Sequence, residues 1–307
     1  MKGVVVKSTG SWFNVLQEDG SIISCKLRGN FRIKGLKATN PIAVGDRVEF
    51  QVTGNANIGQ INNILPRFNY IIRKATNLSK VFHIIAANID QAMLVITVAQ
   101  PRTSQGFIDR FLTTAEAYHI PAYLVFNKTD IYNKELQNIH NEYIHIYSTV
   151  GYPCISISAV TGNNLQQLRQ LFANKVTLFS GHSGVGKTAI LNALDPALGL
   201  REGEISSYHA KGVHTTTFAE MHALSSGGLI IDTPGIKEFG LIDFNKNEIA
   251  ERFPEMRALM HLCHFSNCTH IHEPGCAVKS ALKEGKIFPS RYYNYLSIYN
   301  GEDFPSF

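Results

Sequence analysis

Residues 181–188 read GHSGVGKT and have the spacing of a phosphate-binding loop. They satisfy the pattern G-x-x-x-x-G-K-[ST], and they stand between a β-rich run, VTLFS, and a helical run, TAILNAL. The glycines let backbone N–H groups turn toward phosphate oxygens, and the following helix adds the positive end of its dipole. We expect Lys187 to reach the β- and γ-phosphates and the Thr188 hydroxyl to bind Mg²⁺. The expected phosphate-loop residues are Gly181, His182, Ser183, Gly184, Val185, Gly186, Lys187, Thr188 and Ala189.

A second motif of this chemistry, DTPG, occupies residues 232–235. Asp232 ends the apolar run GLIID, where a carboxylate can hold Mg²⁺ through water. Gly235 can offer its backbone N–H to a γ-phosphate. After a phosphate loop, this motif predicts a sensor of the γ-phosphate.

The motif NKTD, residues 127–130, follows another apolar run, AYLVF. An Asp carboxylate accepts hydrogen bonds from the N1–H and the exocyclic amine of guanine, and adenine lacks that pair of donors. We therefore expect Asp130 to read the base, Asn127 to brace the loop and the Lys128 stem to cover the base. The run ISISA resembles a second guanine loop. The expected base-contacting residues are Asn127, Lys128, Thr129, Asp130, Ser158 and Ala159.

Between the phosphate loop and DTPG lies a polar stretch, SSYHAKGVHTTTFAE, at residues 206–220. Thr215 or Thr216 could close on Mg²⁺ as a switch threonine, and the spacing does not decide between them. Many GTPases carry a water-positioning Gln after D-x-x-G, but this chain has Ile236 there. His214 is a candidate to orient the water instead, and an ordinary exposed loop histidine is the alternative. The candidate catalytic residues are Lys187, His214, Thr215 and Thr216.

The order of these motifs is unusual, because the guanine-reading motif precedes the phosphate loop. Ligand binding in an α/β sheet depends on loops at strand ends rather than on chain order, so the same site can be built from a permuted chain. The motifs therefore indicate a circularly permuted enzyme that hydrolyses GTP to GDP and phosphate, with Mg²⁺ bound alongside the nucleotide.

The elements that position these motifs alternate from about residue 70 to 240. Apolar strand candidates are separated by amphipathic helices, which predicts a mostly parallel α/β sheet. The expected helices cover residues 106–119, 133–150, 164–174 and 187–194.

The N-terminal segment has a different character, with five short β-rich runs in about 65 residues. That pattern suits an OB-like barrel, and an SH3-like barrel fits nearly as well. Up to Arg67 we count nine Lys and Arg against four Asp and Glu, so this segment carries the whole formal net charge of +5. A basic small barrel favours a polyanionic partner such as RNA, and charge that serves only solubility is the alternative.

Three of the five cysteines cluster near the C-terminus in CHFSNCTHIHEPGC. Their odd total and spacing disfavour a disulfide framework and favour a metal. Three thiolates and one imidazole match a closed tetrahedral Zn²⁺ site that would order a helical tail. Cys25 and Cys154 lie in strand-like runs and are expected in the core. The expected ligands are Cys263, Cys268, His270 and Cys276, with His261, His264 and His272 as competitors.

Taken together, these motifs resemble the ribosome small-subunit-dependent GTPase A family (RsgA, also called YjeQ). The resemblance covers nearly the whole chain and rests on NKTD, SA, GHSGVGKT, HTTT, DTPG, EFG and CHFSNCTHIHEPGC in the family's order. It implies a GTPase that binds the small ribosomal subunit and its rRNA, acts late in the maturation of that subunit and is stimulated by it. It also implies one structural zinc ion at the four ligands.

The resulting expectation is a multidomain protein. An OB-like RNA-binding β-barrel would span residues 1–67, and a permuted α/β P-loop GTPase domain residues 68–243. A helical zinc-binding domain would span residues 244–307. Without a secretory signal or an apolar run of about 18 residues, we expect a cytoplasmic protein that does not contact membranes. We also expect it to be a monomer. The alternative function is a GTP-gated module that binds a non-ribosomal RNA.

Overall fold

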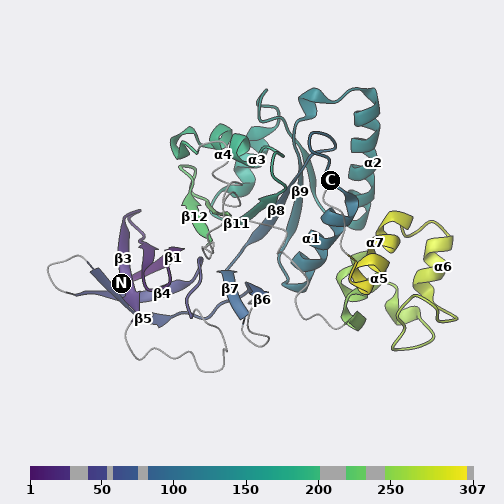
Figure 1. Cartoon of the computed structure of the whole chain (residues 1–307), viewed down its shortest axis with the longest axis horizontal. Coiled ribbons are helices and arrows are strands. Elements are labelled where there is room, and N and C mark those ends of the chain that lie inside the picture. Colours follow the sequence, from purple (N-terminus) through teal and green to yellow (C-terminus); the bar gives the residue numbers. More distant parts are fainter. Residues whose placement is uncertain (28–40, 54–57, 75–81, 201–218, 233–245, 303–307) are drawn as a thin grey trace. The chain divides into compact units, whose positions relative to one another are not determined.

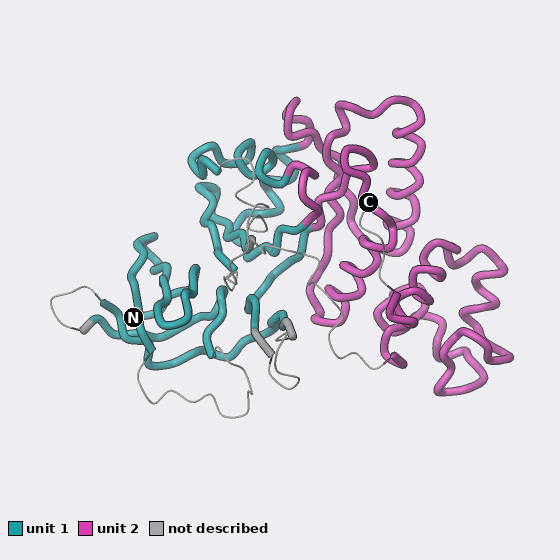
Figure 2. Tube along the Cα trace, in the orientation of Figure 1, with its two compact units in different colours: residues 1–93, 165–180, 187–238 teal, residues 94–164, 181–186, 239–307 magenta. Residues whose placement is uncertain are grey.

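The structure is a computed structural model of the chain, and it describes residues 1–27, 41–53, 58–74, 82–200, 219–232 and 246–302 (Figure 1). The chain forms two compact units, and each unit draws on several segments (Figure 2). Unit 1 comprises residues 1–93, 165–180 and 187–238, and unit 2 comprises residues 94–164, 181–186 and 239–307. The expected linear boundaries at residues 67 and 243 stay a prediction.

The N-terminal part of unit 1 is a closed five-stranded β-barrel. Its neighbours follow the order β1-β2-β3-β5-β4, and β4 pairs back onto β1. The β3–β5 pairing is parallel, whereas the others in the barrel are antiparallel, so the barrel is no simple meander and fits the OB-like alternative. The strands are β1 (Lys2–Ser8), β2 (Phe13–Leu16), β3 (Ile22–Leu27), β4 (Arg47–Thr53) and β5 (Ile58–Ile64).

The barrel is filled by the alternate residues of these strands, as expected for a pleated surface with one buried face. Cys25 is fully buried there, which agrees with its expected place in a core. The other members of this core include Val5, Phe13, Val15, Val48, Phe50 and Ile61.

Strand β1 belongs to the barrel and also to the sheet that follows in unit 1. It pairs with β12 (Glu220–Ala223), and Lys7 forms an ion pair with Glu220 at 3.0 Å. Beyond β12 lie β13 (Leu229–Asp232) and β11 (Val176–Gly181), which run parallel to each other. The same unit holds α3 (Leu165–Phe172), α4 (Lys187–Leu194), η2 (Pro196–Leu198) and a two-stranded ribbon of β6 (Tyr70–Lys74) and β7 (Phe82–Ala87).

Unit 2 contains the strand order β10-β9-β8, with β10 (Cys154–Ser156) parallel to β9 (Ala122–Phe126). Strand β8 (Gln91–Ile96), which begins in unit 1, is buried at every position. Its residues after Gln91 are all apolar, as expected for a central strand that is covered on both faces. The helices are α1 (Gln105–Ala117) and α2 (Lys134–Val150), with the short turn η1 (Thr129–Ile131) before α2.

The C-terminal part of unit 2 is helical and has its own small core. Phe253, Met256, Tyr295 and Ile287 are buried within it. This part is only about 57 residues long, and in so small a unit a metal ion commonly adds stability. Its helices are α5 (Pro254–Arg257), α6 (Ala277–Lys283) and α7 (Pro289–Asn300), with the 3₁₀ turns η4 (Lys246–Glu248), η5 (Ala250–Arg252) and η6 (Met260–Leu262).

Candidate functional site

The phosphate-loop motif links the end of β11 to the start of α4. Gly184 and Gly186 have φ angles of +82° and +95°, a region that residues other than glycine rarely adopt. Lys187 begins α4 and is buried, whereas Ser183, Gly184 and Ala189 are exposed. The strand–loop–helix context that the motif requires is therefore present.

Asn127 is the residue that joins the loops of this region. Its side-chain amide donates to the carbonyl of Val185 in the phosphate loop at 2.9 Å, and its side-chain oxygen accepts from the backbone N–H of Ala159 at 3.1 Å. Asn127 is buried, so losing either contact would leave a polar group unpaired. The Asn127 side chain thus connects the NKTD loop to the phosphate loop and to the SA loop.

Gly186 is packed directly against this brace. A Cβ built on Gly186 would collide with the side-chain amide nitrogen of Asn127. The positive φ and the close approach both require glycine here, which gives a steric reason for the second fixed glycine of the motif.

Asp130 and Ser158 meet at the expected base-reading position. The buried Ser158 hydroxyl donates to the Asp130 carboxylate, and it accepts from the backbone N–H of Thr161 at 3.1 Å. The Thr129 hydroxyl donates to the carbonyl of Ile157 at 3.0 Å. Asp130 itself is exposed, so its carboxylate is held in place and also accessible to solvent.

Lys128 has a left-handed φ of +64°, and its ammonium group donates to the carbonyl of Gln100. This contact ties the NKTD loop to the segment before α1, and the sequence did not predict it. A further unpredicted support is Tyr132, whose hydroxyl donates to the carbonyl of Asn127 at 2.8 Å. Burial raises the pKa of Tyr132 to about 12, so the hydroxyl keeps the proton that it donates.

His182, the second residue of the phosphate loop, contacts the ring of Phe107 on α1. The two ring centroids are 3.8 Å apart, with the planes inclined by 31°. The phosphate loop is therefore packed against the first turns of α1 as well as braced by Asn127.

The DTPG motif is described only at its first residue. Asp232 ends β13, and its backbone is in register with Phe179, two residues before the phosphate loop. Gly235 and the switch candidates His214, Thr215 and Thr216 lie outside the described residues.

The cysteines and the histidine of the C-terminal motif come together as predicted. The ligand atoms of Cys263, Cys268, His270 and Cys276 all lie within 4.8 Å of one another. His270 Nδ1 is 3.6 Å from Cys263 Sγ and 3.4 Å from Cys276 Sγ. A tetrahedral zinc ion with its usual bond lengths would separate such atoms by about 3.6 Å. The four residues therefore fit a zinc ion.

The loop that carries these ligands is held by its own hydrogen bonds. The Glu273 carboxylate accepts from the N–H and hydroxyl of Thr269 at 2.8 and 2.6 Å, and from the N–H of Ile271 at 3.1 Å. Partial burial alone would raise the pKa of Glu273, but these hydrogen bonds lower it to about 2. The three competing histidines are exposed and are not part of the group: His261, His264 and His272.

The sequence matches known proteins over nearly its full length. Residues 64–242 match the RsgA GTPase family and residues 2–61 match the RsgA N-terminal domain. The chain belongs to the RsgA GTPase family. This membership makes it a GTPase, as the sequence predicted.

Two bacterial relatives show how far the sequence similarity extends along this chain. "Small ribosomal subunit biogenesis GTPase RsgA 2" of Bacteroides thetaiotaomicron is 51% identical over 97% of this chain and 96% of the relative. "Small ribosomal subunit biogenesis GTPase RsgA" of Flavobacterium psychrophilum is 50% identical over 99% of this chain and 94% of the relative.

Two solved structures of the family share the fold. YjeQ from Thermotoga maritima has a TM-score of 0.79 and 35% identity, over 98% of this chain and 97% of that one. YloQ, described as a circularly permuted GTPase, has a TM-score of 0.74 and 28% identity, over 98% and 94%. The predicted architecture of an N-terminal barrel, a permuted GTPase domain and a C-terminal Cys₃His group is thus confirmed. In the described part of this RsgA-family chain, every helix is too short or too polar to span a membrane.

Proposed function

We propose that this RsgA-family GTPase binds Mg²⁺–GTP in the loops joined by Asn127, and that it acts in the cytoplasm in late maturation of the small ribosomal subunit. The observation that carries the nucleotide site is the placement of Asn127. It contacts the phosphate loop and the SA loop while its neighbour Asp130 is held by Ser158. A nucleotide that spans these loops has its phosphates and its base bound by one connected frame.

Within this site, each residue has a role that follows from its chemistry. Lys187 would bind the β- and γ-phosphates, and Thr188 would bind Mg²⁺. Asp232 and Gly235 would sense the γ-phosphate, and Thr215 or Thr216 would complete the Mg²⁺ shell. His214 is the candidate that orients the attacking water.

The Cys₃His group would hold one structural zinc ion. Four protein ligands leave no open position, so the ion would stabilise the fold rather than take part in the reaction. The buried Nε2 of His270 has no hydrogen-bond partner among the described residues, whereas Nδ1 points at two sulfurs. Nδ1 is therefore the nitrogen that would bind the metal.

The barrel is suited to contact rRNA. Trp12 is 37% exposed, and the Lys26 ammonium lies 4.1 Å from its ring centroid. Both Trp12 and the exposed Ile22 line a hollow on the barrel surface. An exposed aromatic ring beside a cation is a platform on which unpaired bases stack. The partner proposed for this arm is rRNA of the small subunit, and the protein would act as a monomer.

The test of the proposed function is GTP turnover by the purified protein with equimolar small ribosomal subunits, and with large subunits as control. We expect small subunits to stimulate turnover strongly and large subunits to have no effect. Slow turnover that neither subunit changes would reject the ribosomal role, and would favour a GTP-gated module for another RNA.

Replacing Asp130 by Asn is expected to move base preference from guanine toward xanthine. The amide offers one acceptor where guanine presents two donors, whereas xanthine offers an oxygen at the position of the exocyclic amine. Leaving one polar partner unpaired should weaken GTP binding by about 10- to 100-fold. Equilibrium binding of GTP and XTP measures the change, with Asp19→Asn on the barrel as control. Unchanged guanine preference would contradict the assignment of Asp130.

Replacing Glu273 by Gln is expected to weaken zinc retention. The glutamine NH₂ group would face backbone N–H groups from which the carboxylate now accepts hydrogen bonds. Substituting a residue that supports metal ligands commonly weakens metal affinity by about 10- to 100-fold. Competition with a chromogenic chelator measures the effect. The exposed Glu284→Gln is the matched control in the same helical part. Equal retention in both variants would show that Glu273 does not support the ligand loop.

A further inference from the structure

Helix α7 is bonded to the loop that carries the Cys₃His group. The Tyr292 hydroxyl donates to the carbonyl of His270 at 2.8 Å, and the Tyr295 hydroxyl donates to the carbonyl of Thr269 at 2.5 Å. His270 is one of the four ligands, and it is almost fully buried. The position of α7 is therefore linked to the backbone geometry of the ligand loop.

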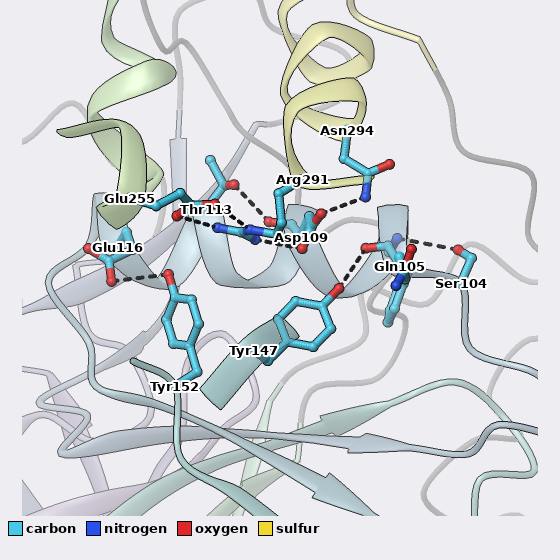
Figure 3. Close-up of polar contacts among 11 residues, drawn as sticks. Ser104, Gln105, Asp109, Thr113, Glu116, Tyr147, Tyr152, Glu255, Arg291 and Asn294 are labelled. Carbon is cyan, nitrogen blue, oxygen red and sulfur yellow. Dashed lines mark hydrogen bonds and ion pairs between the residues drawn. The ribbon is translucent and has the colours of Figure 1, made fainter. Parts of the chain in front are cut away.

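The same helix is bonded to α1 through one buried carboxylate, shown in Figure 3. Arg291 Nη1 lies 2.6 Å from Asp109 Oδ1, and Asn294 Nδ2 lies 2.5 Å from Asp109 Oδ2. Arg291 and Asn294 are three residues apart and so share a face of the helix. Both oxygens of Asp109 therefore accept hydrogen bonds from α7. Because Asp109 is fully buried, a displacement of α7 would leave its charge poorly paired.

Two further contacts hold this junction in one geometry. Glu255 on α5 binds the other edge of the Arg291 guanidinium, with Nε 2.7 Å from Oε1 (Figure 3). Glu116, near the end of α1, accepts from Arg257 Nη1 at 2.9 Å. A planar guanidinium bound on two edges has little rotational freedom, which makes the α1–α7 junction rigid.

Helix α1 carries this junction to the phosphate loop. Phe107 lies two residues before Asp109, so the two side chains leave α1 in different directions. Its ring contacts His182 of the phosphate loop, with 3.8 Å between centroids. A continuous set of contacts therefore runs from the ligand loop through α7, Asp109 and α1 to the phosphate loop, all of it within unit 2.

We propose that Asp109 is a positioning residue that couples the Cys₃His group to the phosphate loop, so that zinc and guanine nucleotide strengthen each other's binding. The inference rests on the proposed nucleotide and zinc sites, and it goes beyond them because neither site by itself requires the other. Coupling of this kind is reciprocal: whatever factor zinc adds to nucleotide affinity, the nucleotide must add to zinc affinity.

The test is a chelator titration of the zinc-loaded full-length protein, with and without saturating GDP. We expect GDP to raise the chelator concentration for half-release of zinc by about five- to tenfold, near the lower end of known coupling factors. Phe107→Leu removes the ring contact between α1 and the phosphate loop, and Asn294→Leu removes a hydrogen bond between α7 and Asp109 of α1. Each substitution should reduce the effect of GDP on zinc release to below about twofold. Asn300→Leu alters an exposed residue of the same type on the same helix and should keep the full factor.

The ratio separates coupling from simple loss of stability. A variant that only loosens the fold would release zinc more easily with and without GDP alike, so its ratio would stay that of the wild type. A wild-type ratio near one, or an unchanged ratio in Phe107→Leu, would overturn the inference. GDP binding is measured directly on the same wild-type sample. If that protein binds no GDP, the proposed nucleotide site fails first and the coupling fails with it.

Discussion

Replacing Lys187 by Ala is expected to lower GTP turnover by about 10²- to 10³-fold, the usual effect of removing one preorganised donor from a developing negative charge. Lys187 begins α4 directly after the loop glycines and is buried. Its ammonium group would therefore act on the phosphates in a site of low dielectric, where its charge has a larger effect than in water.

The measurement is single-turnover hydrolysis together with equilibrium GDP binding. Lys134→Ala removes an exposed lysine from the first position of α2 and is the matched control. The Lys187 variant should keep its preference for guanine over adenine, because that preference is assigned to the separate NKTD loop. A Lys187→Ala protein that turns over GTP at the normal rate would reject the assignment of the phosphate loop.

Replacing Arg291 by Met is expected to destabilise unit 2 by about 3–5 kcal/mol, since it leaves buried carboxylates without their cation. Arg291 is 1% exposed and contacts both Asp109 and Glu255. Its guanidinium carbon also lies 4.6 Å from the ring centroid of Phe253, so the substitution removes a cation–π contact as well. Urea unfolding of the zinc-loaded protein measures the loss.

The same variant should show a characteristic pH dependence. Burial raises the pKa of Asp109, and the Arg291 guanidinium opposes that shift. Without Arg291, burial raises the pKa of the folded-state carboxyl further, and the penalty is full only above that raised pKa. It shrinks as the pH falls through the raised folded pKa toward the ordinary Asp value. The difference in unfolding free energy between wild type and variant should therefore be smaller at pH 5 than at pH 7.5.

A companion substitution checks the cause. Asp109→Asn removes the charge that Arg291→Met would leave unpaired, so the double variant should be more stable than the sum of the single effects predicts. Strict additivity would show that the two residues do not interact, and a loss of stability that is independent of pH would show that lost packing dominates.

The motifs that predict the chemistry could be found in the amino-acid sequence because each of them is local. Residues 181–188 carry their own strand, turn and helix signals, and α4 begins at Lys187 as those signals predict. The four metal ligands lie within 14 residues, so a single loop can bring them together without contacts to distant parts of the chain. The five barrel strands could be predicted for the same reason, since alternation of apolar residues and turn residues is a short-range pattern.

The contacts between these local segments, in contrast, could not be predicted before the fold was known. Asn127 and Val185 are 58 residues apart, and Asp109 and Arg291 are 182 apart. No periodicity or spacing links such pairs, because each contact depends on which elements pack together. The sequence gives one indication of the Asp109–Arg291 pair, since Asp109 is a charged residue between Ile108 and Phe111, which are both buried in α1. A charge placed there requires a buried partner, but the identity of that partner is settled only when α7 packs against α1.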